Sequence, residues 1–347
     1  MTAPGDRPLA GLKVVDLTKL LPGPLATLQL AELGADVTKV EGPARDGQAD
    51  GMRVMLSTAA DRAAGRPSLA FRSLNAGKRL VELDLRTPAG RDALLALARE
   101  ADLLIEGFRP GVLDKLGLGW DTLHAANRRL VLCTISGYGP DNAWAHRAGH
   151  DINYIAMAGV LEQTATRDGA IAVPNFQIAD LMGGTQGAMV GVLAALLAAQ
   201  RSGVGRRVDV SMTHEVYRHH VLARFTLEAT GRTPAPGRDL LSGGAPCYAA
   251  YRCADGRWMA VGALELKFWQ ALCTTLGHPE WAEQHWSRGL EPGSEASMAL
   301  RDEVAAVFAT RPMAHWAEAF EAVDACVTPV LRLDELQHHP VHRPRPG

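Results

Sequence analysis

A histidine and three carboxylates stand at points in the sequence where side chains could move protons. His150 and Asp151 are adjacent in RAGHDINYIAMAG (147–159), just after a glycine and at the start of an expected helix. Asp180 lies thirty residues beyond His150 and opens a glycine-containing helix, and Glu265 follows an expected strand in VGALELKFW. Imidazole and carboxylate groups are common general acids and bases. The four residues are therefore candidates for acid–base chemistry.

Each of the four residues also has an ordinary structural explanation. A lone histidine at a helix start is more often structural than catalytic, and aspartates such as Asp151 and Asp180 commonly cap helices. Glu265 occupies a place where a first-turn helix carboxylate is common. The unpaired N–H groups and the positive dipole end of a helix also favour negative charge beside Asp151. Considered singly, none of these residues predicts a function.

The usual phosphate-binding fingerprints are absent from the sequence. No G-x-G-x-x-G follows the first expected strand, no G-x-x-x-x-G-K-[ST] occurs, and Gly137-Tyr138-Gly139 lacks the third glycine. Open α/β sheets bind ligands at the carboxyl ends of their strands. Basic residues recur at expected strand ends, namely Lys78, Arg79, Arg109 and Lys115. This recurrence favours a local anion site, although solvated surface residues would give the same pattern.

The first part of the chain alternates expected strands and helices. Strands are expected at 12–17, 35–41, 79–85, 101–108, 129–137 and 206–212. Helices are expected at 25–34, from Pro88 to residue 100 behind the cap residue Thr87, from Asp180 to about residue 200, and from His214 to about Gly231. Strand–helix repetition of this kind predicts a parallel α/β sheet in a large domain, residues 1–229.

The pattern changes after the Pro- and Gly-rich segment 230–246, which has the composition of a linker. Residues 248–264 alternate like a strand pair about the turn Ala254-Asp255-Gly256. Helices are expected around 266–277, 298–310 and 313–322, before a final apolar run at 326–333. These elements predict a smaller α+β domain, residues 230–333. Residues 334–347 are expected to begin a C-terminal return segment that is short or truncated.

Bulk composition excludes several classes of protein. The 347 residues carry a formal net charge of −2, so no nucleic-acid or membrane partner is expected. Five scattered cysteines without metal-ligand spacing predict reduced thiols and no metal site. The N-terminus lacks a signal-peptide pattern. The longest apolar stretch, 188–199, is too short for a transmembrane helix. A soluble, cytoplasmic protein is expected.

Taken together, the motifs resemble those of the class III CoA-transferase family, and within it those of the α-methylacyl-CoA racemases. The resemblance runs through nearly the whole chain, in segments such as LAGLKVVDLTKLLPGPLATLQLAELGADVTKVE, EGFRPGVLDKLGLG, SGVGRRVDVSM and GGAPCYAAYRCADGRWMAVGAL. The racemase-like features are GHDINY (149–154), Asp180 and Glu265. The resemblance implies an interlocked homodimer whose subunits have a large Rossmann-like CoA-binding domain and a small domain. It also implies an active site between subunits and no cofactor, since coenzyme A is part of the acyl-CoA substrate.

The resemblance implies a role for each candidate residue. His150 and Asp180 would exchange the α-proton of a 2-methylacyl-CoA thioester through an enolate, one group on each face of the α-carbon. Glu265 would orient the imidazole of His150 across the subunit interface, and Tyr154 would order the Asp180 side. Backbone N–H donors near Asp151 would stabilise the enolate oxygen. The implied CoA-binding residues are Leu83, Asp84, Leu85, Arg86, Arg109, Lys115, Gly149, Ile152 and Asn153.

The chain departs from the racemase pattern at three places. Gly42 stands where the racemases have an arginine, so a phosphate contact is either missing or supplied by Arg45. The segment 44–75 is longer than in the simplest racemases and could reshape the acyl or adenine pocket. Leu266-Lys267 replaces the usual proline and glutamine after the glutamate, which changes the loop around Glu265.

Two other functions remain open. A class III CoA-transferase would use Asp180 as a nucleophile, but transferases of this family usually carry an aromatic residue at the position of His150. The other alternative is a weakly active or non-catalytic CoA-binding paralogue, which Gly42 and the altered loop after Glu265 suggest.

Overall fold

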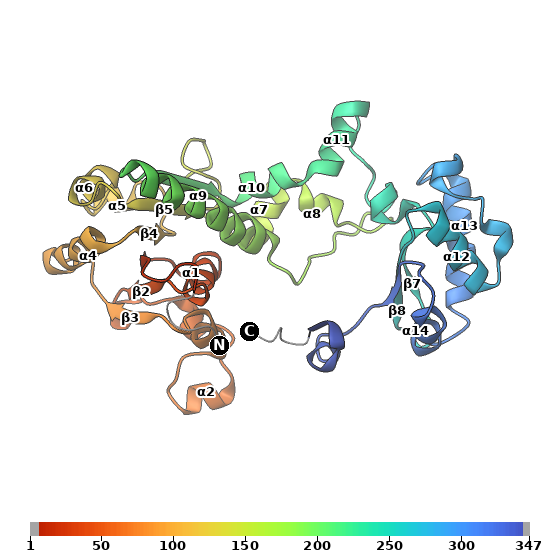
Figure 1. The fold of residues 1–347 in the computed structure, drawn as a ribbon, viewed down its shortest axis with the longest axis horizontal. Helices are drawn as coiled ribbons and strands as arrows, with labels where there is room; N and C mark the ends of the chain where they lie inside the picture. Colours follow the sequence, from red (N-terminus) through yellow and green to blue (C-terminus); the bar gives the residue numbers. More distant parts are fainter. Residues whose placement is uncertain (1–6, 343–347) are drawn as a thin grey trace. The chain divides into compact units, whose positions relative to one another are not determined.

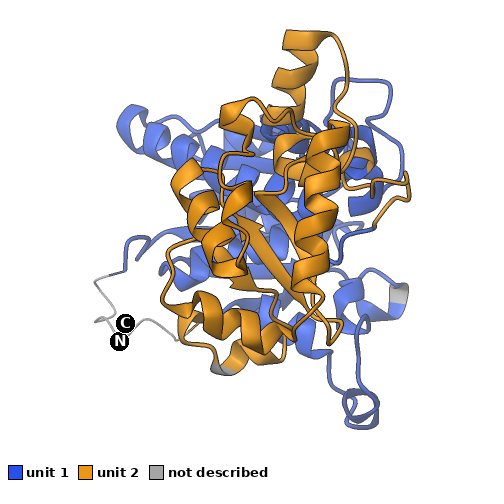
Figure 2. Cartoon of the chain, turned by 90° about the vertical axis from the view of Figure 1, so that its right-hand side faces the viewer, with its two compact units in different colours: residues 1–161, 173–221 blue, residues 162–172, 222–347 orange. Residues whose placement is uncertain are grey.

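The computed structural model describes residues 7–342, which form two compact units (Figure 2). The first unit comprises the chain up to Leu161 together with Val173–Val221, and the second comprises Glu162–Ala172 and the chain from Leu222 onward. This division differs from the predicted boundary after residue 229. Composition indicated a linker only at 230–246, whereas the segment Glu162–Ala172 folds on itself through an antiparallel bridge and belongs to the second unit.

The first unit is built on a six-stranded sheet with the order β3-β2-β1-β4-β5-β6 (Figure 1). All neighbouring strands pair in parallel. Each strand lies inside a predicted one, so the parallel α/β sheet is confirmed. The order reverses direction between β1 and β4, as in doubly wound Rossmann-like sheets. The strands are β1 (Lys13–Asp16), β2 (Asp36–Glu41), β3 (Arg79–Glu82), β4 (Leu103–Glu106), β5 (Val131–Ser136) and β6 (Arg207–Ser211).

Helices cover both faces of this sheet, because successive strand residues point to opposite sides. Val14 of β1 belongs to an apolar cluster with α1 (Pro22–Glu32) and α9 (Gly187–Ser202). Val15 belongs to a second cluster with α4 (Pro88–Glu100) and α6 (Trp120–Ala126). The predicted start of α4 is confirmed, since the Thr87 hydroxyl accepts the N–H of Gly90 at 3.0 Å. Shorter helices are α5 (Val112–Lys115), α7 (Asp151–Met157) and α8 (Val160–Gln163).

The helix that carries Asp180 begins with a wide turn. Residues Ala179–Gln186 (η3) form a π-helix that continues directly into α9. The combined run is 24 residues long and by length and composition alone could cross a membrane. The prediction from the apolar stretch 188–199 had therefore underestimated the length of this helix. However, Ala188, Val192 and Ala195 pack in the core of the first unit. The helix is therefore a core element of this unit.

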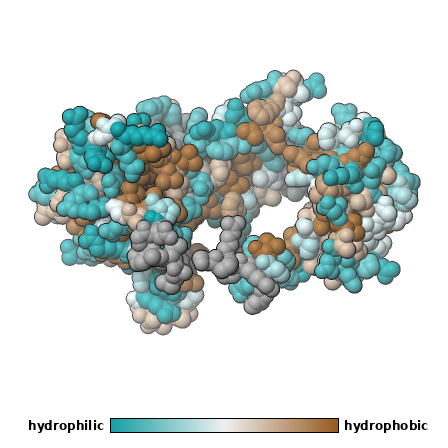
Figure 3. Space-filling view, viewed as in Figure 1, coloured by the Kyte–Doolittle hydropathy of each residue, from teal (hydrophilic) through white to brown (hydrophobic). Residues whose placement is uncertain are grey.

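One side of α9 is apolar and exposed. Val190 is 73% exposed, and Leu193 and Leu197 are exposed on the same helix. In Figure 3, brown apolar atoms gather over the region that α9 occupies in Figure 1. An exposed apolar strip of this kind is typical of a protein–protein interface.

The helix predicted at 214–231 is two helices. α10 (Met212–His219) ends at His220, whose backbone is not helical, and α11 (Val221–Thr230) follows. The break lies at the boundary between the two units. A continuous apolar pattern did not reveal it.

The second unit packs helices against an antiparallel sheet of β7 (Tyr248–Arg252), β8 (Trp258–Gly262) and β9 (Val327–Pro329). The predicted strand pair and the smaller α+β fold are thus confirmed. Helices α12 (Leu266–Leu276), α13 (Glu295–Phe308) and α14 (Met313–Glu321) enclose an apolar cluster with it. Shorter helical turns are η4 (Leu240–Gly244), η5 (Pro279–Trp281), η6 (Trp286–Arg288), η7 (Glu335–His338) and η8 (Pro340–His342). Of the expected C-terminal segment 334–347, residues 343–347 lie outside the described part of the chain.

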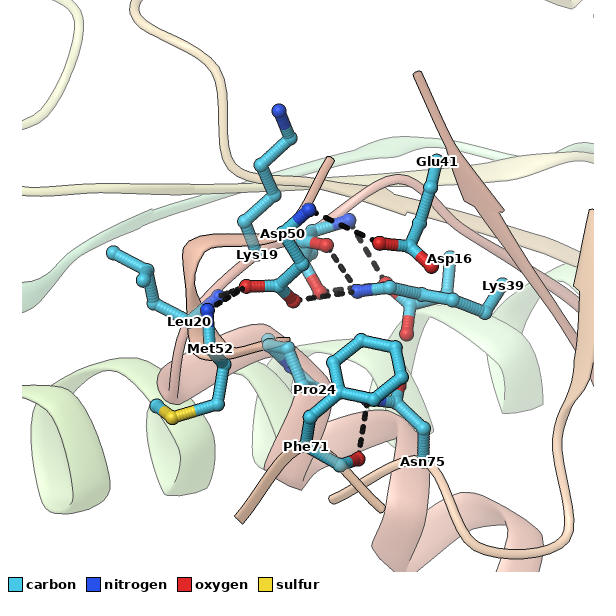
Figure 4. A network of polar contacts seen from close by, with 12 residues as sticks. Asp16, Lys19, Leu20, Pro24, Lys39, Glu41, Asp50, Met52, Phe71 and Asn75 are labelled. Atoms are coloured by element: carbon cyan, nitrogen blue, oxygen red, sulfur yellow. Dashed lines mark hydrogen bonds and ion pairs between the residues drawn. The ribbon is translucent and has the colours of Figure 1, made fainter. Parts of the chain in front are cut away.

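The segment 44–75 folds against the carboxyl ends of β1 and β2 (Figure 4). Asp50 holds the segment in place. Its carboxylate accepts the N–H groups of Leu20 and Met52, each at 2.9 Å, and forms an ion pair with the buried Lys39 at 3.4 Å. The guanidinium of Arg53 binds the carboxylate of Glu41 through two hydrogen bonds. Buried charges are retained where they are paired in this way. The elements of the segment are η1 (Ala44–Asp46), η2 (Gly51–Arg53), α2 (Ala59–Ala63) and α3 (Leu69–Leu74).

Candidate active site

A hollow of about 340 Å³ lies at the carboxyl ends of β1, β4 and β5 in the first unit. The strand order reverses between β1 and β4, and open α/β sheets bind ligands at such a point. The sequence-predicted residues that line the hollow are His150, Asp180, Tyr154, Arg109 and Gly149. The fold therefore brings the histidine before α7 and the aspartate of η3 to one site. We call this space the acid–base hollow.

Buried carboxylates shape two of the strand ends around the acid–base hollow. Asp16 accepts the N–H of Thr18 at 2.8 Å, just after β1. Glu106 accepts the N–H of Phe108 at 2.6 Å, just after β4. Burial raises the pKa of Glu106 to about 7. Each hydrogen bond turns the chain within two residues of the strand end, so that Thr18 and Phe108 line the hollow.

His150 immediately precedes α7, as predicted, and is exposed in the single chain. Its backbone N–H donates to the side-chain oxygen of Asn153 at 3.0 Å, which closes the start of the helix. The hydroxyl of Tyr154 donates to the carbonyl of Gly149 at 2.5 Å. The backbone on both sides of His150 is therefore fixed by side chains of its own helix.

Tyr154 is buried beneath the acid–base hollow. Burial, with smaller contributions from Tyr138 and Asp180, raises its pKa to about 12, so the phenol stays protonated. A Cβ at Gly137 would lie 2.3 Å from the Tyr154 ring, so only glycine fits there. The expectation was that Tyr154 orders the Asp180 side. Its hydroxyl hydrogen bond instead serves the His150 side, because Gly149 precedes His150, and the influence of Asp180 on Tyr154 is electrostatic.

Asp180 is partly buried at the start of η3 beside a second carboxylate. The Asp151 carboxylate accepts the backbone N–H groups of Ala179 and Asp180 at 2.6 and 3.0 Å. Burial, and then the negative charge of Asp151, raise the pKa of Asp180 to about 6. Asp151 therefore caps η3 from a different helix, while Asp180 itself makes no capping bond within the described residues. A carboxyl group with this pKa is suited to both giving and taking a proton near neutral pH.

Three cationic side chains line the acid–base hollow: Lys19, Arg109 and Arg147. Lys19 donates to the carbonyl of Gln48, and burial lowers its pKa while Asp50 and Glu41 act in the opposite direction. The sequence identified Arg109 but missed Lys19 and Arg147. Lys19 follows β1 as Arg109 follows β4, so the same strand-end rule would have found it. Arg147 lies in the loop before α7, where no pattern distinguishes it.

A second hollow of about 230 Å³ adjoins the acid–base hollow and shares Lys19 and Phe108 with it. Its lining includes the predicted CoA-binding residues Leu83, Leu85 and Arg86. Gly42 lies in the lining as well, where the racemases have an arginine. We call this space the strand-end hollow.

Basic side chains lie beside the strand-end hollow. Arg86 binds Asp84 at 2.8 Å and, with a smaller contribution from Arg45, lowers the pKa of Asp84 to about 2. The replacement of the missing arginine at Gly42 by Arg45 stays a prediction.

The other predicted residues lie elsewhere. Lys115 ends α5 and lines neither hollow, and Ile152 is an exposed residue of α7. The side chain of Asn153 serves the helix start. Glu265 belongs to the second unit and precedes α12, but its side chain makes no capping hydrogen bond. The carboxylate is thus not used for the ordinary helix-start role, and its place beside His150 stays a prediction.

No group of three or more His, Cys, Asp and Glu side chains within residues 7–342 is arranged to hold a metal ion. Four cysteines are buried thiols and Cys326 is exposed. The predicted lack of a metal or cofactor remains a prediction.

Comparisons with known proteins relate nearly the whole chain to one family. The family model for CoA-transferase family III matches residues 9–346. The α-methylacyl-CoA racemase of Homo sapiens is 35% identical over 342 residues, which cover 97% of this chain and 81% of that protein. The acetyl-CoA:oxalate CoA-transferase of Acetobacter aceti is 31% identical, covering 96% of this chain and 83% of that protein. The orthorhombic crystal structure of Rv3272 from M. tuberculosis superposes with a TM-score of 0.78 and 29% identity, covering 96% and 87% of the two chains.

Proposed function

Because the chain belongs to CoA-transferase family III, we propose that it racemises 2-methylacyl-CoA thioesters by moving the α-proton between His150 and Asp180. The observation that carries the proposal is that both side chains line one hollow at the switch point of the sheet. The similarity to the human α-methylacyl-CoA racemase supports the same activity. The proposed enzyme is an isomerase.

Racemisation by proton transfer needs two groups of similar basicity, because each must act as the base for one enantiomer and as the acid for the other. The pKa of Asp180 is raised to about 6, so near neutral pH this carboxyl group is present in both its protonated and its ionised form. A carboxyl group with an ordinary pKa would return the proton to carbon poorly, because it would rarely be protonated. The raised pKa therefore makes transfer in both directions feasible.

The intermediate would be an enolate, whose oxygen carries the negative charge. The thioester makes the α-proton more acidic than an ester or a carboxylate would, which is the chemical reason for the CoA group. Backbone N–H groups at the start of α7, near Asp151, would donate to that oxygen, and such preorganised donors are often the largest contribution to catalysis. The reaction needs neither a metal ion nor a redox cofactor.

We place the CoA portion of the substrate in the strand-end hollow, with the acyl portion in the acid–base hollow. The two hollows share Lys19 and Phe108, so one ligand could occupy both. Arg45 and Arg86 would meet the phosphates of CoA, since guanidinium groups bind phosphate through paired hydrogen bonds.

We propose that the active protein is a homodimer. The exposed apolar side of α9 offers an interface, because Val190, Leu193 and Leu197 would be removed from water in it. In the dimer, Glu265 of one subunit would approach His150 of the other and orient its imidazole.

A CoA-transferase is the second candidate, because the chain is also similar to the acetyl-CoA:oxalate CoA-transferase of Acetobacter aceti. In that reaction Asp180 would attack the thioester carbonyl and form an anhydride, with CoA leaving as the thiolate. The presence of His150 in the acid–base hollow favours the racemase, since nucleophilic transfer assigns it no role.

Incubation of one enantiomer of a 2-methylacyl-CoA in deuterated water, without an acceptor acid, separates these functions. We expect inversion of the centre with one deuterium incorporated at the α-carbon. A transferase leaves the thioester unchanged until an acceptor acid is added, and a CoA-binding paralogue leaves it unchanged in both cases. His150→Gln and Asp180→Asn should each abolish inversion. Because each variant keeps one base, it should still exchange the α-proton of one enantiomer with solvent. Inversion at the wild-type rate in either variant would refute the two-base scheme.

A further inference from the structure

The second unit contains a hollow of about 630 Å³, far larger than a water site and within the usual range of small-ligand sites. Three arginines line it, Arg167, Arg238 and Arg301, together with Thr166, Asp168 and Ser242. None of these residues belongs to the acid–base hollow or to the strand-end hollow. We call this space the arginine hollow.

The three arginines reach the arginine hollow from separate parts of the second unit. Arg167 lies in the hairpin 162–172, where Thr166 and Ala170 are joined by a backbone hydrogen bond of 2.8 Å. Arg238 lies two residues before η4, and Arg301 lies on α13. The approach is close, because a Cβ at Gly237 would lie 2.8 Å from the side chain of Arg167. Three like charges brought together from separate elements repel one another, so this arrangement calls for compensation by negative charge or by hydrogen-bond acceptors.

The guanidinium of Arg301 lacks that compensation within the described residues. Its Nη1 is buried and has no hydrogen-bond partner there. Burial lowers the pKa of Arg301 and the positive charge of Arg167 lowers it further, while Tyr251 and Asp302 act more weakly in the opposite direction. A buried charged donor without an acceptor is costly and is rare in folded proteins.

The acidic groups nearby do not balance the three arginines. Asp302 lies 3.8 Å from Arg167 and is mostly exposed to water. The carboxylate of Asp168 accepts the hydroxyl of Thr166. Neither carboxylate makes a hydrogen bond or ion pair with Arg238 or Arg301 among the described contacts. An excess of positive charge therefore faces the arginine hollow.

We propose that the arginine hollow binds a phosphate group, held by the guanidinium groups of Arg167 and Arg301 and closed by Arg238. Guanidinium groups bind phosphate oxygens in pairs, and a phosphate offers enough acceptors for several arginines at once. Ser242 lines the hollow as well, with its hydroxyl hydrogen-bonded to the backbone of Asp239. The phosphate comes either from a free anion such as pyrophosphate or from a phosphate of coenzyme A.

Titration of the full chain with sodium pyrophosphate in a calorimeter tests the proposal. We expect one saturable site per chain, with affinity that falls as KCl is raised, because charge pairs are screened. Arg301→Met should weaken binding by roughly tenfold or more, the usual effect of losing hydrogen bonds to a charged group. Arg167→Met should act in the same direction. The matched control is Arg311→Met, an exposed arginine of the same unit outside the hollow.

Two further measurements make the outcome decisive. Repeating the titration with saturating CoA separates the sources. If the binding that Arg301→Met weakens is undiminished by CoA, the site takes a free anion, whereas loss of that Arg301-dependent binding identifies a phosphate of CoA. If circular dichroism shows that Arg301→Met does not fold, the pyrophosphate affinity of Arg167→Met, a substitution on the hairpin 162–172, takes its place as the test. No saturable heat with the wild-type chain, or equal affinity in Arg167→Met, Arg301→Met and Arg311→Met, overturns the proposal.

Discussion

The carboxylate of Asp151 accepts the backbone N–H of Asp180 at 3.0 Å, so two acidic residues from different helices meet at the start of η3. Together with its bond to the N–H of Ala179, this carboxylate caps η3 and positions Asp180. Its negative charge also contributes to the raised pKa of Asp180. A pair of substitutions at Asp151 should separate these effects.

Asp151→Asn keeps an oxygen that can accept the two N–H groups but removes the charge. We expect the pKa of Asp180 to fall from about 6 towards its ordinary value. For the enantiomer from which Asp180 removes the proton, the rate rises as Asp180 ionises, so the acidic limb of its profile should move to lower pH. For the other enantiomer Asp180 must be protonated, and activity at neutral pH should fall. The measurement is the rate of racemisation against pH from each enantiomer.

Asp151→Ala removes the capping oxygen as well, so it should also lower the free energy of unfolding by about 1 kcal/mol. Urea unfolding of the two Asp151 variants provides the comparison. Identical pH profiles in wild type and Asp151→Asn would show that burial alone sets the pKa of Asp180.

Asp180→Asn should stabilise the protein at pH 8 while abolishing racemisation. The folded-state pKa of about 6 lies above the ordinary 3.8, so the charged form is disfavoured by folding. The protonated carboxyl group of Asp180 makes its full contribution to the free energy of unfolding below about pH 4. This contribution is lost as the pH rises through 6 and stays absent above that pH. The difference corresponds to about 3 kcal/mol, which partial exposure reduces to about 2. Unfolding by urea at pH 8 and pH 4 measures it, and a gain equal at both pH values, or none, would contradict the assignment.

Asp50→Ala should lower the free energy of unfolding by about 3 kcal/mol, because it leaves the buried Lys39 without its nearest carboxylate. The matched control is Glu100→Ala, which removes the exposed pair between Lys13 and Glu100 and should cost less than about 1 kcal/mol. Comparable losses in both variants would mean that the 44–75 segment does not depend on Asp50.

Glu265→Gln should reduce racemisation less than substitution of His150, because its proposed role is to orient the imidazole and raise its basicity. Orienting partners contribute roughly 10- to 100-fold at metal sites, and we expect an effect of that order. The limb of the rate profile that belongs to His150 should move to lower pH. An unchanged profile would mean that Glu265 does not act on the imidazole of His150.

The sheet could be predicted from the sequence because buried parallel strands are short apolar runs. LLIE of β4 and VLCTIS of β5 are such runs, and each strand pairs with a neighbouring strand on both sides. The break at His220 could not be predicted, because the apolar pattern continues through it. The wide turn of η3 has no local sequence pattern, and its Gly183 lies against the backbone of the distant Met212.

Residue type and position made His150 and Asp180 acid–base candidates, and only the resemblance gave them roles. His150 and Asp180 are thirty residues apart, and only the fold brings them to one hollow. The role of Asp151 as a cap for another helix has no local signature, because its partners are 28 and 29 residues away. Lys19 shows the converse, a residue that the strand-end rule could have identified.

The π-helical turn of η3 absorbs one residue without changing the phase of the helix that follows it. A π-helix holds one residue more than the α-helix that would otherwise occupy the same place, so a single deletion between Asp180 and α9 would convert the turn into regular α-helix. Because both forms fill the same place, α9 would keep its packing in the core and only the local backbone would change. The wide turn, in which Gly183 lies against the backbone of Met212, would narrow, and Asp180 at its start would shift with it. The additional residue can therefore be understood as a local insertion confined to the one turn that carries the acid.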